Sequence, residues 1–220
     1  MIDVKNISIK KRLRNCSFTV ERGKIAAIIG ENGSGKTTVL EAIAGVLSPD
    51  RGSIELPHDR SELISYCPEQ AYFYHYFSVE ALFDFYQSQF HDFNRGKAEA
   101  LADFFQLDRQ EKMAYLSKGQ VNRAKIAVTL ARDCPYLVLD EPLAGLDPIV
   151  KQKIVQGIIH FIDLEQQSLL ITTHELLEIE TILDEVIVMR DGHVIAQEEV
   201  ETIREGMPVQ EWLQQLYETV

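Results

Sequence analysis

Short apolar stretches alternate with helix-like stretches through the middle of the chain. Apolar alternation or continuous apolar runs predict strands over 2–9, 16–21, 24–30, 63–68, 136–142, 168–174, 185–192 and 193–197. Helical periodicity predicts helices over 37–47, 79–90, 96–105, 119–132 and 149–163. Strands that alternate with helices favour a parallel sheet covered on both faces, and the antiparallel-looking strands at both ends favour a small second sheet.

Aromatic residues are concentrated in one segment. Ten of the nineteen aromatic side chains lie between positions 72 and 93. Such density is typical of the core of a helical subdomain, and it also suits an apolar groove that takes up a helix of a partner. The two interpretations are compatible.

Composition narrows the class of protein. With 220 residues and 45% apolar residues, the chain can bury the core of one large domain. The net charge of −12, from 34 acidic and 22 basic residues, argues against a general nucleic-acid binder. The charge is uneven, since seven Lys or Arg lie in the first 24 residues and eleven acids lie in 178–220. Solvated surface or the orientation of a partner explains such asymmetry.

Cysteine use and hydropathy predict a cytoplasmic protein. Cys16, Cys67 and Cys134 form no CxxC pair, and their odd number fits no closed disulfide framework. The first eleven residues are too polar for a signal peptide, and no apolar run approaches the ~20 residues that cross a bilayer. We therefore expect any membrane role to use another chain.

The stretch GENGSGKTT follows a buried apolar run and opens a helix, which is the context that a G-x-x-x-x-G-K-[ST] phosphate loop requires. Gly33 and Gly35 let successive backbone N–H groups point inward, and the helix that starts near Lys36 adds its positive end. We expect Lys36 to reach the β- and γ-phosphates of a nucleotide and the Thr37 hydroxyl to bind Mg²⁺. The predicted nucleotide-binding residues of this loop are Gly30, Glu31, Asn32, Gly33, Ser34, Gly35, Lys36, Thr37 and Thr38.

The stretch YLVLDEP supplies the acidic residues. Four apolar residues bury the strand, and Asp140 emerges at its carboxyl end, where α/β sheets place ligands. We expect Asp140 to hold Mg²⁺ through its waters and Glu141 to polarise an attacking water. Together with the phosphate loop, this predicts a P-loop NTPase. Kinases, motor ATPases and transporter ATPases share both motifs.

Five ordered motifs separate these classes: GENGSGKTT, CPEQ, LSKGQ before YLVLDEP, AGLD and ITTH. With them, nearly the whole chain resembles the ATP-binding cassette (ABC) ATPases, specifically the nucleotide-binding subunit of a bacterial ABC transporter. The resemblance implies an α/β P-loop NTPase fold with a RecA-type parallel-sheet core, an antiparallel β subdomain and a helical subdomain. It also implies one domain over 1–220, with the helical subdomain inserted at about 78–127.

The resemblance assigns roles to three single residues. Gln70 in CPEQ would touch Mg²⁺ or the attacking water, and its loop would sense a membrane subunit; as a residue alone it also suits a turn. His174 in ITTH would contact the γ-phosphate and orient the water. Asp147 in AGLD would cross a dimer interface, which is compatible with a role as the N-cap of a helix that begins at Pro148.

The LSKGQ motif would act on a second subunit. In the family, the residues that correspond to Ser117, Gly119 and Gln120 cap the γ-phosphate of ATP bound to the opposite chain. A serine hydroxyl, a glycine N–H and a helix N-terminus make a second anion cradle. Two chains would then enclose two nucleotides head to tail, with ATP holding the pair together.

The chain departs from the family in two places. No aromatic residue lies within the first 17 residues to stack on adenine, so Lys11, Arg12 or Arg14 lies over the base, or the pocket selects the base weakly. Lys118 stands where many members have glycine. Its side chain either points to solvent or adds positive charge to the second cradle.

The resemblance thus predicts an ATPase that hydrolyses ATP with Mg²⁺ and energises a separate transmembrane permease at the inner face of the membrane. A cytosolic helix of the permease would dock between the Gln70 loop and the aromatic-rich segment. The LSKGQ motif and the stretch 172–196 resemble those of exporters more than those of importers, so we favour export. We also expect no large regulatory domain after the core. A soluble ABC-type ATPase acting on nucleic acid or ribosomes is the alternative, although no second cassette, long insert or basic arm is visible. A small-molecule kinase would leave Gln70, Ser117 and His174 without a purpose.

Overall fold

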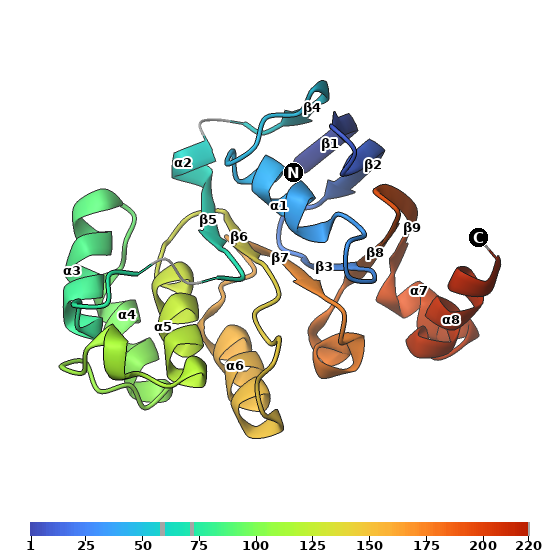
Figure 1. The fold of residues 1–220 in the computed structure, drawn as a ribbon. Helices are drawn as coiled ribbons and strands as arrows, with labels where there is room; N and C mark the ends of the chain where they lie inside the picture. The colour runs from blue at the N-terminus through green and yellow to red at the C-terminus, as the bar shows by residue number, and fades with distance from the viewer. Residues whose placement is uncertain (58–59, 71–72, 220) are drawn as a thin grey trace.

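A computed structural model describes residues 1–57, 60–70 and 73–219 (Figure 1). The strands are β1 (Ile2–Ile9), β2 (Leu13–Val20), β3 (Ile25–Ile29), β4 (Arg51–Glu55), β5 (Ile64–Cys67), β6 (Tyr136–Leu139), β7 (Ser168–Thr173), β8 (Glu185–Arg190) and β9 (His193–Glu199). The α-helices are α1 (Lys36–Ile43), α2 (Arg60–Leu63), α3 (Val79–Gln89), α4 (Arg95–Phe104), α5 (Lys118–Leu130), α6 (Pro148–Phe161), α7 (Val200–Gly206) and α8 (Val209–Thr219). The 3₁₀ turns are η1 (Met113–Tyr115), η2 (Leu176–Glu178) and η3 (Glu180–Ile182).

A six-stranded sheet forms the centre of the molecule, in the order β5-β6-β7-β3-β8-β9. The strands from β5 to β8 pair in parallel, and β9 closes the edge antiparallel to β8. All five residues of β3 are buried: Ile25, Ala27 and Ile29 face one apolar cluster, and Ala26 and Ile28 face the other. The sheet is therefore covered on both faces, as its continuous apolar strands predict.

A three-stranded antiparallel sheet, in the order β2-β1-β4, lies over one face of the central sheet, with α1 between them (Figure 1). The expectation that strands from both ends of the chain build this second sheet is wrong. β8 pairs with β3 instead, because its residues are buried on both faces and such a strand is stable only inside a covered sheet. The third strand is β4, whose exposed polar residues gave no apolar pattern to recognise.

The helices α3, α4 and α5 gather on one side of the molecule (Figure 1). Ser78 caps α3 by accepting a hydrogen bond from the backbone N–H of Ala81, so the helix starts where the sequence pattern predicts. The buried residues of these helices belong to the same apolar cluster as one face of the central sheet. The boundaries of 78–127 for a helical subdomain remain a prediction, and α5 itself continues to Leu130.

The C-terminal helices α7 and α8 are additional to the predicted elements and lie beside β9, away from α3 and α4 (Figure 1). The three cysteines are buried and unbridged. Within the described ranges, no helix combines the length and the apolar character that crossing a membrane requires.

Candidate functional site

The phosphate loop connects β3 to α1 at the carboxyl edge of the central sheet. Gly33 and Gly35 have φ of 88° and 103°, the left-handed region that favours glycine. A Cβ on Gly35 would also lie 2.7 Å from Leu13 Cδ2. The loop is held from outside, because the backbone N–H of Gly192 donates to the carbonyl of Ser34 at 3.0 Å.

The Lys36 ammonium is buried inside this loop. It donates to the carbonyl oxygens of Gly30 at 2.8 Å and Glu31 at 3.2 Å, and its Nζ lies 3.3 Å from Glu141 Oε1. Lys36 is 6% exposed. The ammonium therefore closes the loop on itself and faces the acidic residue that follows β6.

Asp140 lies at the end of β6 and is fully buried. Its Oδ1 accepts hydrogen bonds from Thr37 Oγ1 at 3.1 Å and from Thr172 Oγ1 at 2.7 Å. Burial raises the pKa of Asp140, and the bonds from Thr172 and Thr37 oppose that increase. The structure thus brings Thr37 and Asp140 together, as the two motifs predict.

Sequence reasoning missed Thr172, which supports both acidic residues. Its hydroxyl also accepts the backbone N–H of Glu141 at 2.8 Å. Because β6 and β7 are parallel and Leu139 pairs with Ile171, the next residue of β7 falls beside Asp140. In the sequence, Thr172 stands out only as a threonine two positions before His174. Its contact with Asp140 can be recognised only once β6 and β7 are known to be neighbours.

Glu141 is held between two polar side chains. Its Oε2 lies 2.9 Å from His174 Nδ1, and its Oε1 faces Lys36. The backbone at Glu141 has φ of 43°, which is uncommon for a residue with a side chain and directs the carboxylate back over the phosphate loop. The structure therefore brings Glu141 and His174 together, as expected.

A cavity of about 730 Å³ opens above these groups. The phosphate loop, the acidic edge of the sheet and a basic turn form its wall. The lining residues are Lys11, Arg12, Arg14, Asn32, Gly33, Gly35, Lys36, Thr37, Thr38, Glu69, Glu141, Ala144, His174, Asp191 and Gly192. Of the other predicted loop residues, Gly30 and Glu31 act through their carbonyls. The Ser34 hydroxyl is buried under the loop.

The end of the cavity away from the acidic residues is basic. Lys11, Arg12 and Arg14 line it together with Asp191, and no Phe, Tyr or Trp ring of the described residues does. The backbone N–H of Arg14 donates to the carbonyl of Gly192 at 2.8 Å, which ties this turn to the hairpin between β8 and β9. The backbone of this turn is thus held next to the phosphate loop, and its three basic side chains are exposed.

A second cavity of about 480 Å³ lies behind Glu141 and contains Gln70. Gln70 is exposed and shares this cavity with Glu141, whereas Thr37 lines only the first cavity. Glu69 lines both. The predicted residue Gln70 therefore lies beside the same cavity as Glu141, without a contact to Thr37 or Asp140 that the structure records.

The four predicted nucleotide-binding residues that do not belong to the phosphate loop also do not line the first cavity: Ser117, Gly119, Gln120 and Asp147. Ser117 and Gln120 form a reciprocal cap of α5, and Asp147 caps α6 by accepting the N–H groups of Ile149 and Val150 at 3.1 Å. The Lys118 side chain is exposed, and its ammonium lies against the loop at Gly145, where an added Cβ would be 2.6 Å from Nζ.

The residues of the first cavity suit a nucleotide with a divalent cation. Inward backbone N–H groups and a helix N-terminus suit phosphate oxygens. Asp140 does not itself line the cavity, but its Oδ1 accepts the hydroxyl of Thr37, which does, and its buried Oδ2 has no hydrogen-bond partner among the described residues. These are hard oxygen donors of the kind that Mg²⁺ prefers.

Comparisons with known proteins agree with this geometry. The family described as ABC transporter matches residues 13–144, more than half of the chain. A probable ABC transporter ATP-binding protein of Azorhizobium caulinodans is 32% identical over 209 residues, which cover 88% of this chain and 74% of that protein. The chain spans only 12% and 30% of the length of two longer relatives that it matches at 30% identity.

Two solved structures extend the similarity to the fold. One, an ATP-binding subunit of an ABC transporter, has a TM-score of 0.86 at 24% identity and covers 98% of this chain and 99% of that chain. The other is the dimeric structure of a post-hydrolysis state of an ATP-binding cassette bound to ADP and phosphate. It has a TM-score of 0.78 at 22% identity and covers 91% of this chain and 99% of that chain. The predicted P-loop NTPase fold is confirmed, and the chain belongs to the ABC transporter family.

Proposed function

We propose that this chain is the ATP-hydrolysing subunit of an ABC transporter and energises transport through a separate transmembrane subunit. The observation that carries the proposal is the convergence of four side chains around one cavity, Lys36, Thr37, Glu141 and His174, with Asp140 bonded to Thr37 behind them. In this proposal 1–220 is a single ATPase domain with a helical subdomain at about 78–127. The protein would work in the cytoplasm, at the inner face of the membrane.

The residues divide the work of phosphoryl transfer to water. The loop N–H groups and Lys36 would hold the phosphates, so that the ammonium exchanges its contact with Glu141 for the β- and γ-phosphates. Thr37 and Asp140 would hold Mg²⁺, with Gln70 as a further ligand or a contact to the water; the ion neutralises charge on the phosphate oxygens. Glu141 would polarise the attacking water, while His174 orients it and contacts the γ-phosphate.

A second ATPase subunit, identical or closely related, would complete each site. Ser117, Gly119, Gln120 and Asp147 lie outside the cavity of their own chain, so a nucleotide role for them requires another copy. The N-terminus of α5 is capped by Ser117 and its exposed side offers a helix dipole to an anion. A structurally similar cassette is dimeric, which supports a pair of chains, and we propose that the two chains lie head to tail.

The basic end of the cavity predicts weak selection of the base. A guanidinium can stack on any purine, and no aromatic ring of the described residues lines this end. We expect Mg²⁺-dependent phosphate release from both ATP and GTP, with kcat/KM values within about tenfold because no pocket hydrogen-bonds one base alone. The assay measures phosphate with each nucleotide, with and without EDTA. Release that persists in EDTA would contradict the metal site, and a strong preference for ATP would contradict the proposed basic contact.

The permease would dock on an apolar groove of about 380 Å³ that runs between β5 and α3. Tyr66, Phe73, Phe85, Tyr86 and Phe90 line it. Nearby, the rings of Tyr74 and Tyr76 are stacked and are 57% and 68% exposed. The groove begins at the end of β5, just before the loop that carries Gln70, which supports the proposed route from a docked helix to the site. The aromatic segment thus serves both interpretations; its residue Tyr72 lies outside the described residues.

A charge in the groove should detach the permease and spare ATP binding. Phe85 is 41% exposed, so Phe85→Asp introduces a carboxylate that a docked apolar helix would have to desolvate. We expect its co-purification with a candidate permease, such as a polytopic membrane protein if one is encoded beside this chain, to fall at least about tenfold. Ile159→Asp, on α6 and 56% exposed, is the matched control outside the groove. Undiminished co-purification of Phe85→Asp would place the permease elsewhere.

We favour export as the direction of transport, because the LSKGQ motif and the stretch 172–196 resemble those of exporters.

A further inference from the structure

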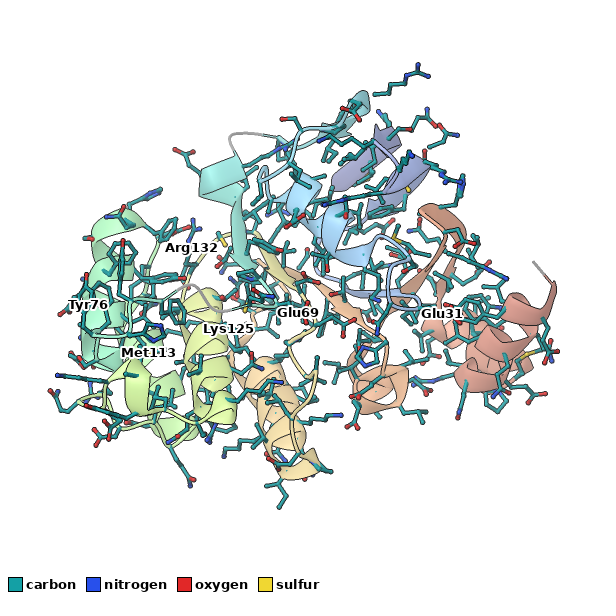
Figure 2. The ribbon with its side chains drawn as sticks, viewed as in Figure 1. Glu31, Glu69, Tyr76, Met113, Lys125 and Arg132 are labelled. Atoms are coloured by element: carbon teal, nitrogen blue, oxygen red, sulfur yellow. The ribbon has the colours of Figure 1, made fainter. Side chains whose placement is uncertain are left out.

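A buried lysine holds the loop that carries Gln70. Lys125 lies in the middle of α5, is 4% exposed, and donates from Nζ to the carbonyl oxygens of Pro68 at 2.8 Å and Glu69 at 2.7 Å. Figure 2 shows Lys125 and Glu69 close together, between α5 and the end of β5. We infer that Lys125 is a positioning residue, whose ammonium fixes this loop and thereby sets the place of Gln70 relative to Glu141. The inference rests on the proposed function for the catalytic role of Gln70.

The loop has few other restraints. The ladder between β5 and β6 ends where Cys67 accepts the backbone N–H of Asp140 at 2.9 Å. In the part of the chain that the structure describes, the two bonds from Lys125 are the only recorded hydrogen bonds to the backbone of 68–70. The Lys125 ammonium therefore binds the chain immediately after the last hydrogen bond between β5 and the residues that follow β6.

The chemistry of Lys125 is unusual for a purely structural residue. No carboxylate of the described residues lies within ion-pair distance of it, so its buried charge is compensated by carbonyl dipoles. Such a charge is costly to bury, and an apolar side chain of similar length would fill the same space without that cost. A buried cation here is best explained by the loop that it holds.

Lys125 also lies in the wall between two cavities. It lines the cavity that contains Gln70 and Glu141, and it lines the aromatic groove on the other side of the loop. The helix that carries it begins at Lys118 and is capped by Ser117. One side chain therefore connects the start of the Gln70 loop to the helix of the LSKGQ motif, and the geometry needs no bound partner to do so.

Removal of the ammonium should lower catalysis without lowering stability. For Lys125→Met we expect kcat of ATP hydrolysis to fall roughly 10- to 100-fold, because a small misplacement of a catalytic group is enough for such a loss. The Kd of Mg-ATP should stay within about twofold, since no phosphate contact is touched, and the melting temperature should be unchanged or higher. Lys97→Met, which removes a largely buried lysine of α4 far from the loop, is the control with wild-type activity.

A double-mutant cycle with Gln70→Ala tests whether Lys125 acts through Gln70. The inference expects Lys125→Met to cost nothing further in kcat when Gln70 is already absent. Equal losses in both backgrounds would overturn it, as would a Lys125→Met variant with wild-type kcat.

The ¹³C chemical shifts of the backbone carbonyls of Pro68 and Glu69 supply a readout that does not need activity, because each of these carbonyls accepts a hydrogen bond from Lys125. Upfield shifts of these two carbonyls in Lys125→Met, with the rest of β5 and α5 unchanged, are the expected result, and unchanged shifts would overturn the inference. If the wild-type protein released no phosphate from ATP, the proposed function would fail while this measurement still decided what Lys125 holds.

Discussion

Replacement of Glu141 with glutamine is expected to lower the rate of ATP hydrolysis by at least about 100-fold, the usual contribution of a positioned general base. Glutamine has the same shape and keeps a polar contact with His174, which lies 2.9 Å from the carboxylate. It lacks the charge that would polarise water. Nucleotide affinity should be unchanged or higher, because Lys36 no longer has Glu141 as a competing partner 3.3 Å away. Phosphate release and equilibrium nucleotide binding measure the two effects separately.

The same variant tests the proposed dimer. If hydrolysis is what separates the two chains, Glu141→Gln with Mg-ATP should elute from a sizing column as a stable dimer, and the wild-type protein should not. Glu178→Gln is the matched control, because it also removes an acidic residue near His174 but one that pairs with Lys151. A persistent Glu141→Gln monomer with ATP bound would contradict the head-to-tail arrangement and leave Ser117 as a helix cap alone.

The parts of the site that could be predicted are those specified by neighbours in sequence. The run from β3 through the phosphate loop to α1 is one continuous segment, so its glycines, Lys36 and Thr37 follow from local rules. Asp140 and Glu141 follow from a buried strand with acids at its end. The five main helices were predicted within a few residues of their observed ends, since their caps and apolar faces are also local.

The parts that could not be predicted depend on which strands become neighbours. Thr172 supports Asp140 only because β7 lies beside β6, and β8 joins the central sheet only because it pairs with β3. No sequence pattern distinguishes Lys125 from the other charged residues of its helix. The proposed role of Lys125 follows from its contact with Pro68, 57 residues away in the sequence. Hydrophobic periodicity describes local structure and cannot predict such a contact.

Replacement of Lys36 with alanine is expected to abolish measurable nucleotide binding. Each charge-assisted hydrogen bond to a phosphate is worth about 1.5–3 kcal/mol, so the loss of two raises Kd roughly 100-fold or more. Isothermal calorimetry with Mg-ATP measures this effect, and undiminished affinity would mean that the loop is not a phosphate loop. Thermal unfolding must accompany it, because Lys36 also holds the carbonyls of Gly30 and Glu31 and pairs with Glu141.

A second substitution separates lost binding from lost folding. In Lys36→Ala the Glu141 carboxylate, 9% exposed, loses the buried ammonium beside it, and an uncompensated buried charge costs on the order of 3 kcal/mol. Adding Glu141→Gln removes that charge, so the double variant should regain most of the lost melting temperature. Its nucleotide affinity should stay as low as that of Lys36→Ala, because neither glutamine nor alanine supplies a cation to the phosphates. Recovery of affinity together with stability would show that Lys36 acts on the fold of the loop and not on the nucleotide.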